Sequence, residues 1–70
     1  MPIFLADTDT DLRIIHVHGK DETTRHLRDM GVVEGANIRL LSKEGRSVIL
    51  VLGGSRIALD SALASRIMVG

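Results

Sequence analysis

Two histidines form the clearest pattern of potential metal ligands in this sequence. His16 and His18 are two residues apart within residues 12–18, whose side chains alternate in the manner of a half-buried strand. Side chains two residues apart on a strand point to the same side of a sheet, so both imidazoles are expected on its outer face. Two imidazoles at this spacing could bind one divalent transition metal. The sequence indicates no third ligand, so a solvated pair without a metal is the alternative interpretation.

An acidic pattern runs through residues 7–11, where aspartates alternate with threonines. The alternation is similar to the start of an EF-hand calcium loop. That loop also requires a glycine at its sixth position and a glutamate at its twelfth, and this segment supplies neither. A solvated surface loop is therefore expected here.

Enzymatic catalysis is not expected from this chain. The sequence contains no convincing grouping of a nucleophile, a base and an orienting residue. A chain of 70 residues is also too short to enclose a substrate pocket of the usual few hundred cubic ångströms. We therefore assign no catalytic and no cofactor-binding residues.

The composition indicates one small domain, residues 1–70, with a core built largely from strands. Apolar residues make up 44% of the chain, yet Phe4 is its single aromatic residue. The core must therefore consist of Ile, Val, Leu, Ala and Met side chains, and β-branched residues favour strands. The chain has no cysteine, which excludes disulfides and thiolate zinc sites.

Charge and hydropathy argue against two classes of partner. Nine basic residues balance nine acidic residues, so the chain lacks the positive charge with which most nucleic-acid-binding proteins attract phosphates. No apolar run reaches the roughly 20 residues needed to cross a bilayer. Residues 1–7 also lack the basic and apolar regions of a signal peptide. A cytoplasmic protein that does not insert into a membrane is expected.

The N-terminal part of the chain is predicted to supply a plug and the first long strand. Residues 1–5 are apolar enough for a short strand or a plug, with Phe4 on the core. In the strand at residues 12–18, Ile15 and Val17 are expected to face the core, which leaves the two histidines outside.

A short helix is predicted to follow over residues 22–30. Asp21 or Thr23 can accept backbone N–H bonds at its N-terminus. A helix of under three turns is not stable alone. Leu27 and Met30 are therefore expected to dock on the sheet.

Three strands joined by tight turns are predicted next, at residues 36–42, 48–52 and 56–59. The turns fall at residues 44–46 and at the two glycines 53–54, a pair that strongly favours a hairpin. Consecutive strands with short connections form an antiparallel meander. The side chains expected to face the core from the second and third of these strands are Val48, Leu50, Ile57 and Leu59.

The chain is predicted to end in a helical turn and a last strand. Asp60 can cap a turn over residues 61–65, and residues 66–69 form a strand with Ile67 and Val69 inward. The predicted fold is mainly β. It is a small antiparallel barrel of five to six strands, with one short helix after the first barrel strand and one helical turn before the last strand.

Four segments stand out by their order and spacing, and they are RIIHV at residues 13–17, HLRDMGVVEG at 26–35, GSRIAL at 54–59, and Ala64 with IMV at 67–69. Together they resemble the FeoA family, the small proteins of ferrous iron transport. They also resemble the related SH3-like domain at the C-terminus of iron-dependent repressors, so the resemblance implies an SH3-like barrel. The chain departs from the family pattern at Met30, at Glu34 in place of a common proline, at Asp9 in place of a frequent glycine, and in a short turn around Gly45.

The resemblance implies a function that the residues alone do not give. FeoA proteins are thought to be accessory or regulatory partners of FeoB, the membrane ferrous iron transporter, at its cytosolic GTP-binding region. The alternative is a metal-responsive regulatory domain that binds a divalent transition metal, such as ferrous iron, through His16 and His18. Recognition of proline-rich peptides is disfavoured, because such grooves are lined by aromatic residues.

One apolar stripe is the predicted docking surface. The outer face of the meander is expected to carry Leu41, Ile49 and Val51, with Arg39 at the rim, which is more exposed apolar surface than a small monomer usually has. A protein partner would cover it. Cover by the N-terminal segment, or by a second copy in a homo-oligomer, is the alternative.

Overall fold

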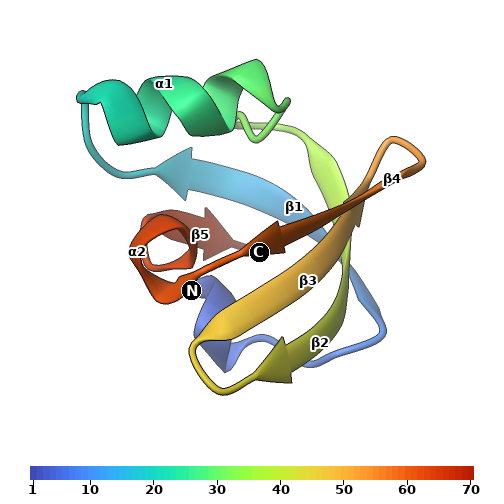
Figure 1. Cartoon of the computed structure of the whole chain (residues 1–70). Helices are drawn as coiled ribbons and strands as arrows, with labels where there is room; N and C mark the ends of the chain where they lie inside the picture. Colours follow the sequence, from blue (N-terminus) through green and yellow to red (C-terminus); the bar gives the residue numbers. More distant parts are fainter.

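The chain forms one antiparallel sheet of five strands that curls around an apolar core (Figure 1). The computed structural model describes residues 1–70. The strand order is β4-β3-β2-β1-β5, and every neighbouring pair is antiparallel. In chain order the elements are the 3-10 helix η1 (Ile3–Leu5), β1 (Thr10–Val17), α1 (Glu22–Asp29), β2 (Asn37–Glu44), β3 (Ser47–Leu52), β4 (Ser55–Leu59), α2 (Ser61–Ala64) and β5 (Ile67–Val69).

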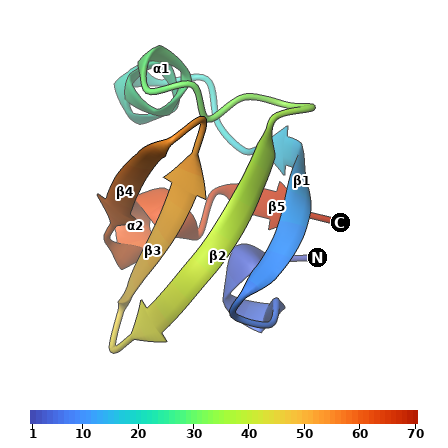
Figure 2. The same ribbon diagram turned by 90° about the vertical axis from the view of Figure 1, so that its right-hand side faces the viewer.

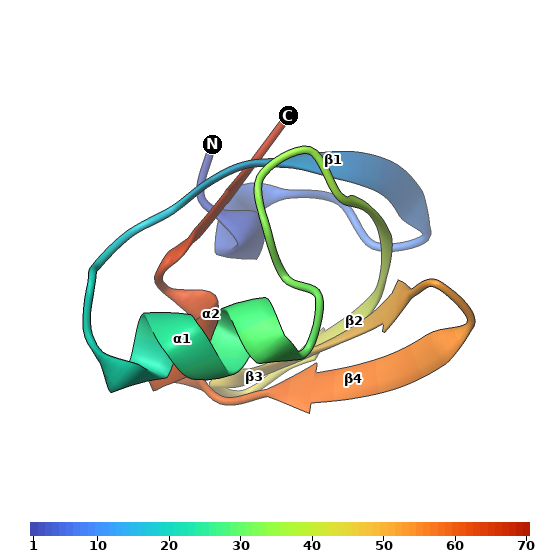
Figure 3. The ribbon, with the colours of Figure 1, turned by 90° about the horizontal axis from the view of Figure 1, so that it is seen from above.

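This architecture confirms the predicted arrangement of strands and helices, with a short helix after the first strand and a small helix before the last. Figure 2 looks onto the outer face of strands β4, β3, β2 and β1, and β5, α2 and η1 lie behind them. Figure 3, seen from above, shows α1 crossing one end of the curled sheet. Neither α-helix is long and apolar enough to span a membrane.

Turn chemistry sets the register of the meander. The hairpin between β3 and β4 contains Gly53 at φ 57° and Gly54 at φ 89°. Positive φ at both central residues is the requirement of a type I′ turn, which glycine meets without a Cβ penalty. The turn pairs Leu52 with Ser55, and the ladder continues to Val48 and Leu59.

Alternate residues of β2 and β3 point into the core, and those of β3 are the two that the sequence predicts. Ile38 and Leu40 are buried from β2, and Val48 and Leu50 from β3. Leu59 is also buried, while Ile57 is half-buried. The full set of buried core side chains is Ile3, Ala6, Leu12, Ile14, Leu27, Val32, Ile38, Leu40, Val48, Leu50, Leu59, Ala64, Ile67 and Val69.

The predicted facing of β1 is wrong at its centre. Ile14 is buried, whereas Ile15 is 54% exposed. The cause is a β-bulge against β5. Ile14 pairs with Val69 and His16 pairs with the adjacent Met68, so Ile15 is an extra residue on β1. The extra residue reverses the inward and outward alternation along the strand. If the two-residue alternation is assumed to be unbroken, Ile15 is therefore assigned to the core in place of Ile14.

The N-terminal segment is a plug and not a strand. Ile3 is fully buried, and Phe4 packs against the core as predicted. The Lys43 ammonium donates hydrogen bonds to the carbonyls of Phe4 at 3.0 Å and Ala6 at 2.6 Å. Backbone bonds between Met1 and Val69 complete the attachment.

Helix α1 is capped at its N-terminus by one of the two residues that the sequence predicts. The Asp21 carboxylate accepts a hydrogen bond from the Thr24 N–H at 3.2 Å, so Asp21 and not Thr23 is the N-cap. Leu27 is fully buried. The helix ends one residue earlier than predicted, because Met30 is its C-cap and Gly31 follows at φ 92°.

Candidate functional site

Cross-strand register aligns four residues in a row across the outer face of the sheet. Asp11 of β1 pairs with Arg39 of β2, Arg39 pairs with Val51 of β3, and Val51 pairs with Arg56 of β4. The Arg39 guanidinium donates a hydrogen bond to the Asp11 carboxylate at 3.1 Å. Both side chains are well exposed, so this ion pair contributes little to stability. The ion pair does hold the Arg39 guanidinium in a fixed position beside Asp11.

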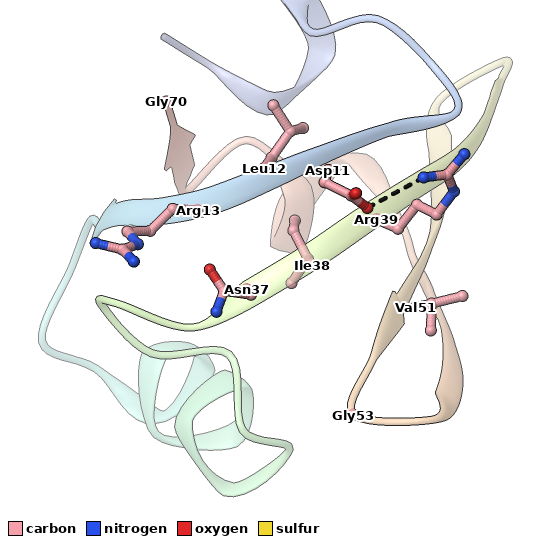
Figure 4. Close-up of a pocket in the computed structure, with 9 residues that line it drawn as sticks. All are labelled: Asp11, Leu12, Arg13, Asn37, Ile38, Arg39, Val51, Gly53 and Gly70. Carbon is pink, nitrogen blue, oxygen red and sulfur yellow. Dashed lines mark hydrogen bonds and ion pairs between the residues drawn. The ribbon is translucent and has the colours of Figure 1, made fainter.

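A shallow hollow of about 550 Å³ opens over the first three residues of this row (Figure 4). The pair formed by Asp11 and Arg39 lies toward one end, and Arg13 and Asn37, which are register partners, lie toward the other. The lining residues are Asp11, Leu12, Arg13, Asn37, Ile38, Arg39, Val51, Gly53 and Gly70.

The structure brings two of the four predicted docking residues into this hollow. Arg39 and Val51 line it, whereas Ile49 and Leu41 do not. Ile49 faces the same side as Val51 and pairs with Ala58. Leu41 falls at a bulge between Leu40 and Ser42, where the register of β2 against β3 shifts. An unbroken two-residue alternation through this strand does not predict the bulge.

The predicted apolar stripe is less exposed than its sequence suggests. Leu41, Ile49 and Val51 are each half-buried. The large apolar side chains with high exposure lie elsewhere in the chain, and they are Met1, Leu5, Ile15 and Val33. The outer face is therefore a mixed surface, with charged side chains beside half-buried aliphatic ones.

The two histidines lie on one face, as predicted, and contact each other. The rings of His16 and His18 meet edge to face with centroids 4.6 Å apart. The His16 Nδ1 atom lies 2.7 Å from a carboxylate oxygen of Glu34, a neighbour that sequence reasoning missed. No group of three or more His, Cys, Asp or Glu side chains is arranged to hold a metal ion.

A polar network joins the start of α1 to the start of β5. The Arg66 guanidinium donates hydrogen bonds to both carboxylate oxygens of Asp21, at 2.8 and 3.1 Å. The hydrogen bonds from Arg66 and from the Thr24 N–H lower the pKa of Asp21 below its usual value. The Thr24 hydroxyl in turn donates to the His18 carbonyl at 3.1 Å. The network is structural, because its members hold the helix against the sheet.

Comparison with protein families identifies the family to which the chain belongs. The model of the FeoA domain matches residues 1–70. The chain belongs to the FeoA family. FeoA proteins are associated with ferrous iron transport. Among curated protein sequences, none matches the chain.

Two solved FeoA structures share this fold over most of their length. A crystal structure of the iron uptake regulatory protein FeoA has a TM-score of 0.87 and 27% sequence identity, over 99% of this chain and 93% of that chain. Stenotrophomonas maltophilia FeoA complexed with zinc has a TM-score of 0.77 and 28% identity, over 91% of this chain and 82% of that chain. That protein is described as a prokaryotic SH3 domain protein, with a suggested role as an activating factor of ferrous iron transport.

A repressor protein contains the same fold in one part of its chain. IdeR from T. acidophilum has a TM-score of 0.89 and 24% identity, over 99% of this FeoA chain but 32% of its own. This likeness shows the fold alone. The fold similarity expected from the resemblance to iron-dependent repressors is therefore found.

Proposed function

We propose that this FeoA protein is an accessory protein of ferrous iron uptake that binds the cytosolic GTP-binding region of a FeoB-type transporter. The observation that carries the proposal is the match of the FeoA domain to residues 1–70. Membership of the FeoA family points to ferrous iron transport as the process in which the protein acts. The outer face of the sheet is a surface suited to a protein partner. An accessory role of this kind requires binding and no catalysis.

The chemistry of the outer face suits a protein interface. Half-buried Ile49 and Val51 supply apolar area, and Arg39 lies beside Val51 in the register. Protein interfaces are enriched in arginine, and their well-packed centres are apolar. Arg13 and Arg56 add exposed cations to this face, where Asp11 is the one carboxylate that lines the hollow and Glu44 lies at the far end of β2. The excess of positive charge favours an acidic surface on the transporter.

The N-terminal segment is held on the other side of the sheet. Ile3 packs in the core, and Met1 bonds to β5. In the view of Figure 2 the segment lies behind the strands whose outer face carries the hollow. This arrangement argues against the N-terminal segment as the cover of Ile49 and Val51. A second copy of the chain is the remaining alternative cover.

A binding experiment with a matched control tests this proposal. Calorimetric titration of the protein against the isolated GTP-binding region of its cognate transporter should give saturable binding. Arg39→Glu should weaken it by reversing the charge in the hollow. Arg25→Glu, on the exposed side of α1, is the control and should bind like wild type. Equal effects of both variants, or no binding by wild type, would contradict the proposal.

A metal-responsive role is the second candidate function. It is favoured by the contact between the His16 and His18 rings and by the zinc complex of S. maltophilia FeoA. Two imidazoles are fewer than the usual number of protein ligands in a stable zinc site. We therefore place this role second.

A further inference from the structure

We propose that the transporter segment recognised by this protein is an extended, acidic peptide that adds as a new strand to the free edge of β4. This inference rests on the proposed function and specifies the partner more closely. Its basis is an open sheet edge beside an unpaired arginine.

The two edges of the sheet differ in their cover. The edge strand β5 is paired with the N-terminus, through the bridge of Pro2 to Met68 and the backbone bonds between Met1 and Val69. The other edge strand, β4, pairs with β3 alone. Figures 2 and 3 both show β4 as the outermost strand, with no strand beyond it. An uncovered edge is a template for strand addition.

The register identifies the backbone groups that are free. A two-residue turn closes on the hydrogen-bonded pair of Leu52 and Ser55, and antiparallel ladders then alternate between bonded and non-bonded pairs. Ile57 and Leu59 therefore bond to β3. Arg56 and Ala58 direct their N–H and C=O groups away from it. None of the backbone hydrogen bonds outside the ladders involves either residue.

The side chains along this edge select the chemistry of the incoming strand. Arg56 is exposed and has no ion-pair partner, in contrast to Arg39, which Asp11 holds. Asp60, the acidic residue just beyond β4, uses its carboxylate to cap α2 through the Leu63 N–H at 3.0 Å. A carboxylate on the incoming strand, on the outer face, would pair with Arg56. A residue on its other face would lie beside half-buried Ile57. The fitting segment thus alternates acidic and apolar residues.

The edge also adjoins the proposed docking face. Ala58 pairs with Ile49, and Arg56 pairs with Val51. A strand added to β4 would therefore extend the sheet that carries the hollow. One partner could occupy both surfaces without a change in the backbone of this protein.

Amide hydrogen exchange on the complex with the GTP-binding region tests the proposal directly. Protection should rise at the amides of Arg56 and Ala58, while Ile57 and Leu59 should change little because their amides already bond to β3. A uniform change along β4, or no change in a complex that does form, would overturn the inference and leave the proposed function standing. A wild-type protein that does not bind the region would instead contradict the proposed function.

Two pairs of variants separate backbone pairing from charge. Ala58→Pro removes an outward N–H at an edge position where proline is tolerated, and it should weaken binding by at least about tenfold. Ala58→Ser keeps the N–H and should bind like wild type.

The second pair of variants tests the charge. Arg56→Glu should weaken binding and Arg56→Lys should largely retain it. This pair keeps the test valid should the proline variant fail to fold. Binding unchanged in Arg56→Glu would refute an acidic partner. Concentration-dependent dimerisation of the free protein, with the same amides protected, would assign the edge to a second copy.

Discussion

Arg66 and Asp21 form a two-point ion pair that locks the first helix of this FeoA protein to its last strand. The guanidinium nitrogens Nη1 and Nη2 lie 2.8 and 3.1 Å from the two carboxylate oxygens. The same carboxylate accepts from the Thr24 N–H, so one side chain caps α1 and anchors it. Planar, bidentate pairing of this kind fixes orientation as well as distance.

The ion pair predicts a loss of stability in acid. The hydrogen bonds from Arg66 lower the pKa of Asp21 in the folded protein, so the unfolded chain binds the proton more readily. The stabilisation is complete above the pKa of the unfolded chain, about 3.9, and is lost as pH falls below it. Thermal unfolding of wild type should show this loss below about pH 4. Asp21→Asn should have a lower melting temperature at neutral pH and a flatter profile in acid. The exposed Asp7→Asn is the control and should follow wild type.

The backbone conformation of Gly19 leads to a second stability prediction, at the same contact between α1 and Arg66. Its φ is +103°, and a Cβ there would meet the Arg66 guanidinium and would lie 2.8 Å from the Thr24 hydroxyl. Gly35 has a similar φ of +86° but open space around it. Gly19→Ala should therefore lower the melting temperature more than Gly35→Ala, since it adds a clash to the shared backbone strain. Equal losses of melting temperature in the two variants would show that the side chains of Arg66 and Thr24 shift to accommodate the added Cβ.

The facing of β3 predicts contrasting costs at neighbouring positions. Leu50 is fully buried, whereas Ile49 is half-buried on the outer face. Leu50→Ala should reduce the free energy of unfolding by about 2–5 kcal/mol, the usual cost of a cavity in a core. Ile49→Ala should cost clearly less. Denaturant unfolding of both variants measures the difference, and the reverse order would place Ile49 inside.

The histidine pair yields a prediction about metal. His16 and His18 contact each other, but no third ligand completes a site. The double variant His16→Ala, His18→Ala should therefore leave both ferrous iron affinity and binding to the GTP-binding region unchanged. Anaerobic calorimetry measures both quantities. A large loss of iron affinity would favour the metal-responsive function instead.

Sequence periodicity predicts most of this fold because its turns carry strong local signals. The glycine pair at 53 and 54 and the caps Asp21 and Asp60 all take the predicted roles. The bulge at Ile15 could not be predicted, since it arises from pairing with β5 at the far end of the chain. A bulge is a property of two strands together, and one strand's sequence does not specify it.

The candidate site was less predictable than the fold. Two-residue alternation correctly puts Arg39 and Val51 on one face, because it holds through that part of β2 and β3. Leu41 falls at a bulge, so alternation gives no reliable position for it. Asp11, Arg13 and Asn37 join the hollow only through pairing of β1 with β2. Long-range register brings them together, and single-sequence patterns do not contain it.

The most direct test of the account is an amide NMR titration of the nitrogen-15-labelled protein with the GTP-binding region of its cognate transporter. Saturable shifts should be concentrated on the outer face, at Arg39, Ile49 and Val51, and on the adjoining edge at Arg56 and Ala58. Shifts centred on His16, His18 and α1, or no shifts at any ratio, would contradict it.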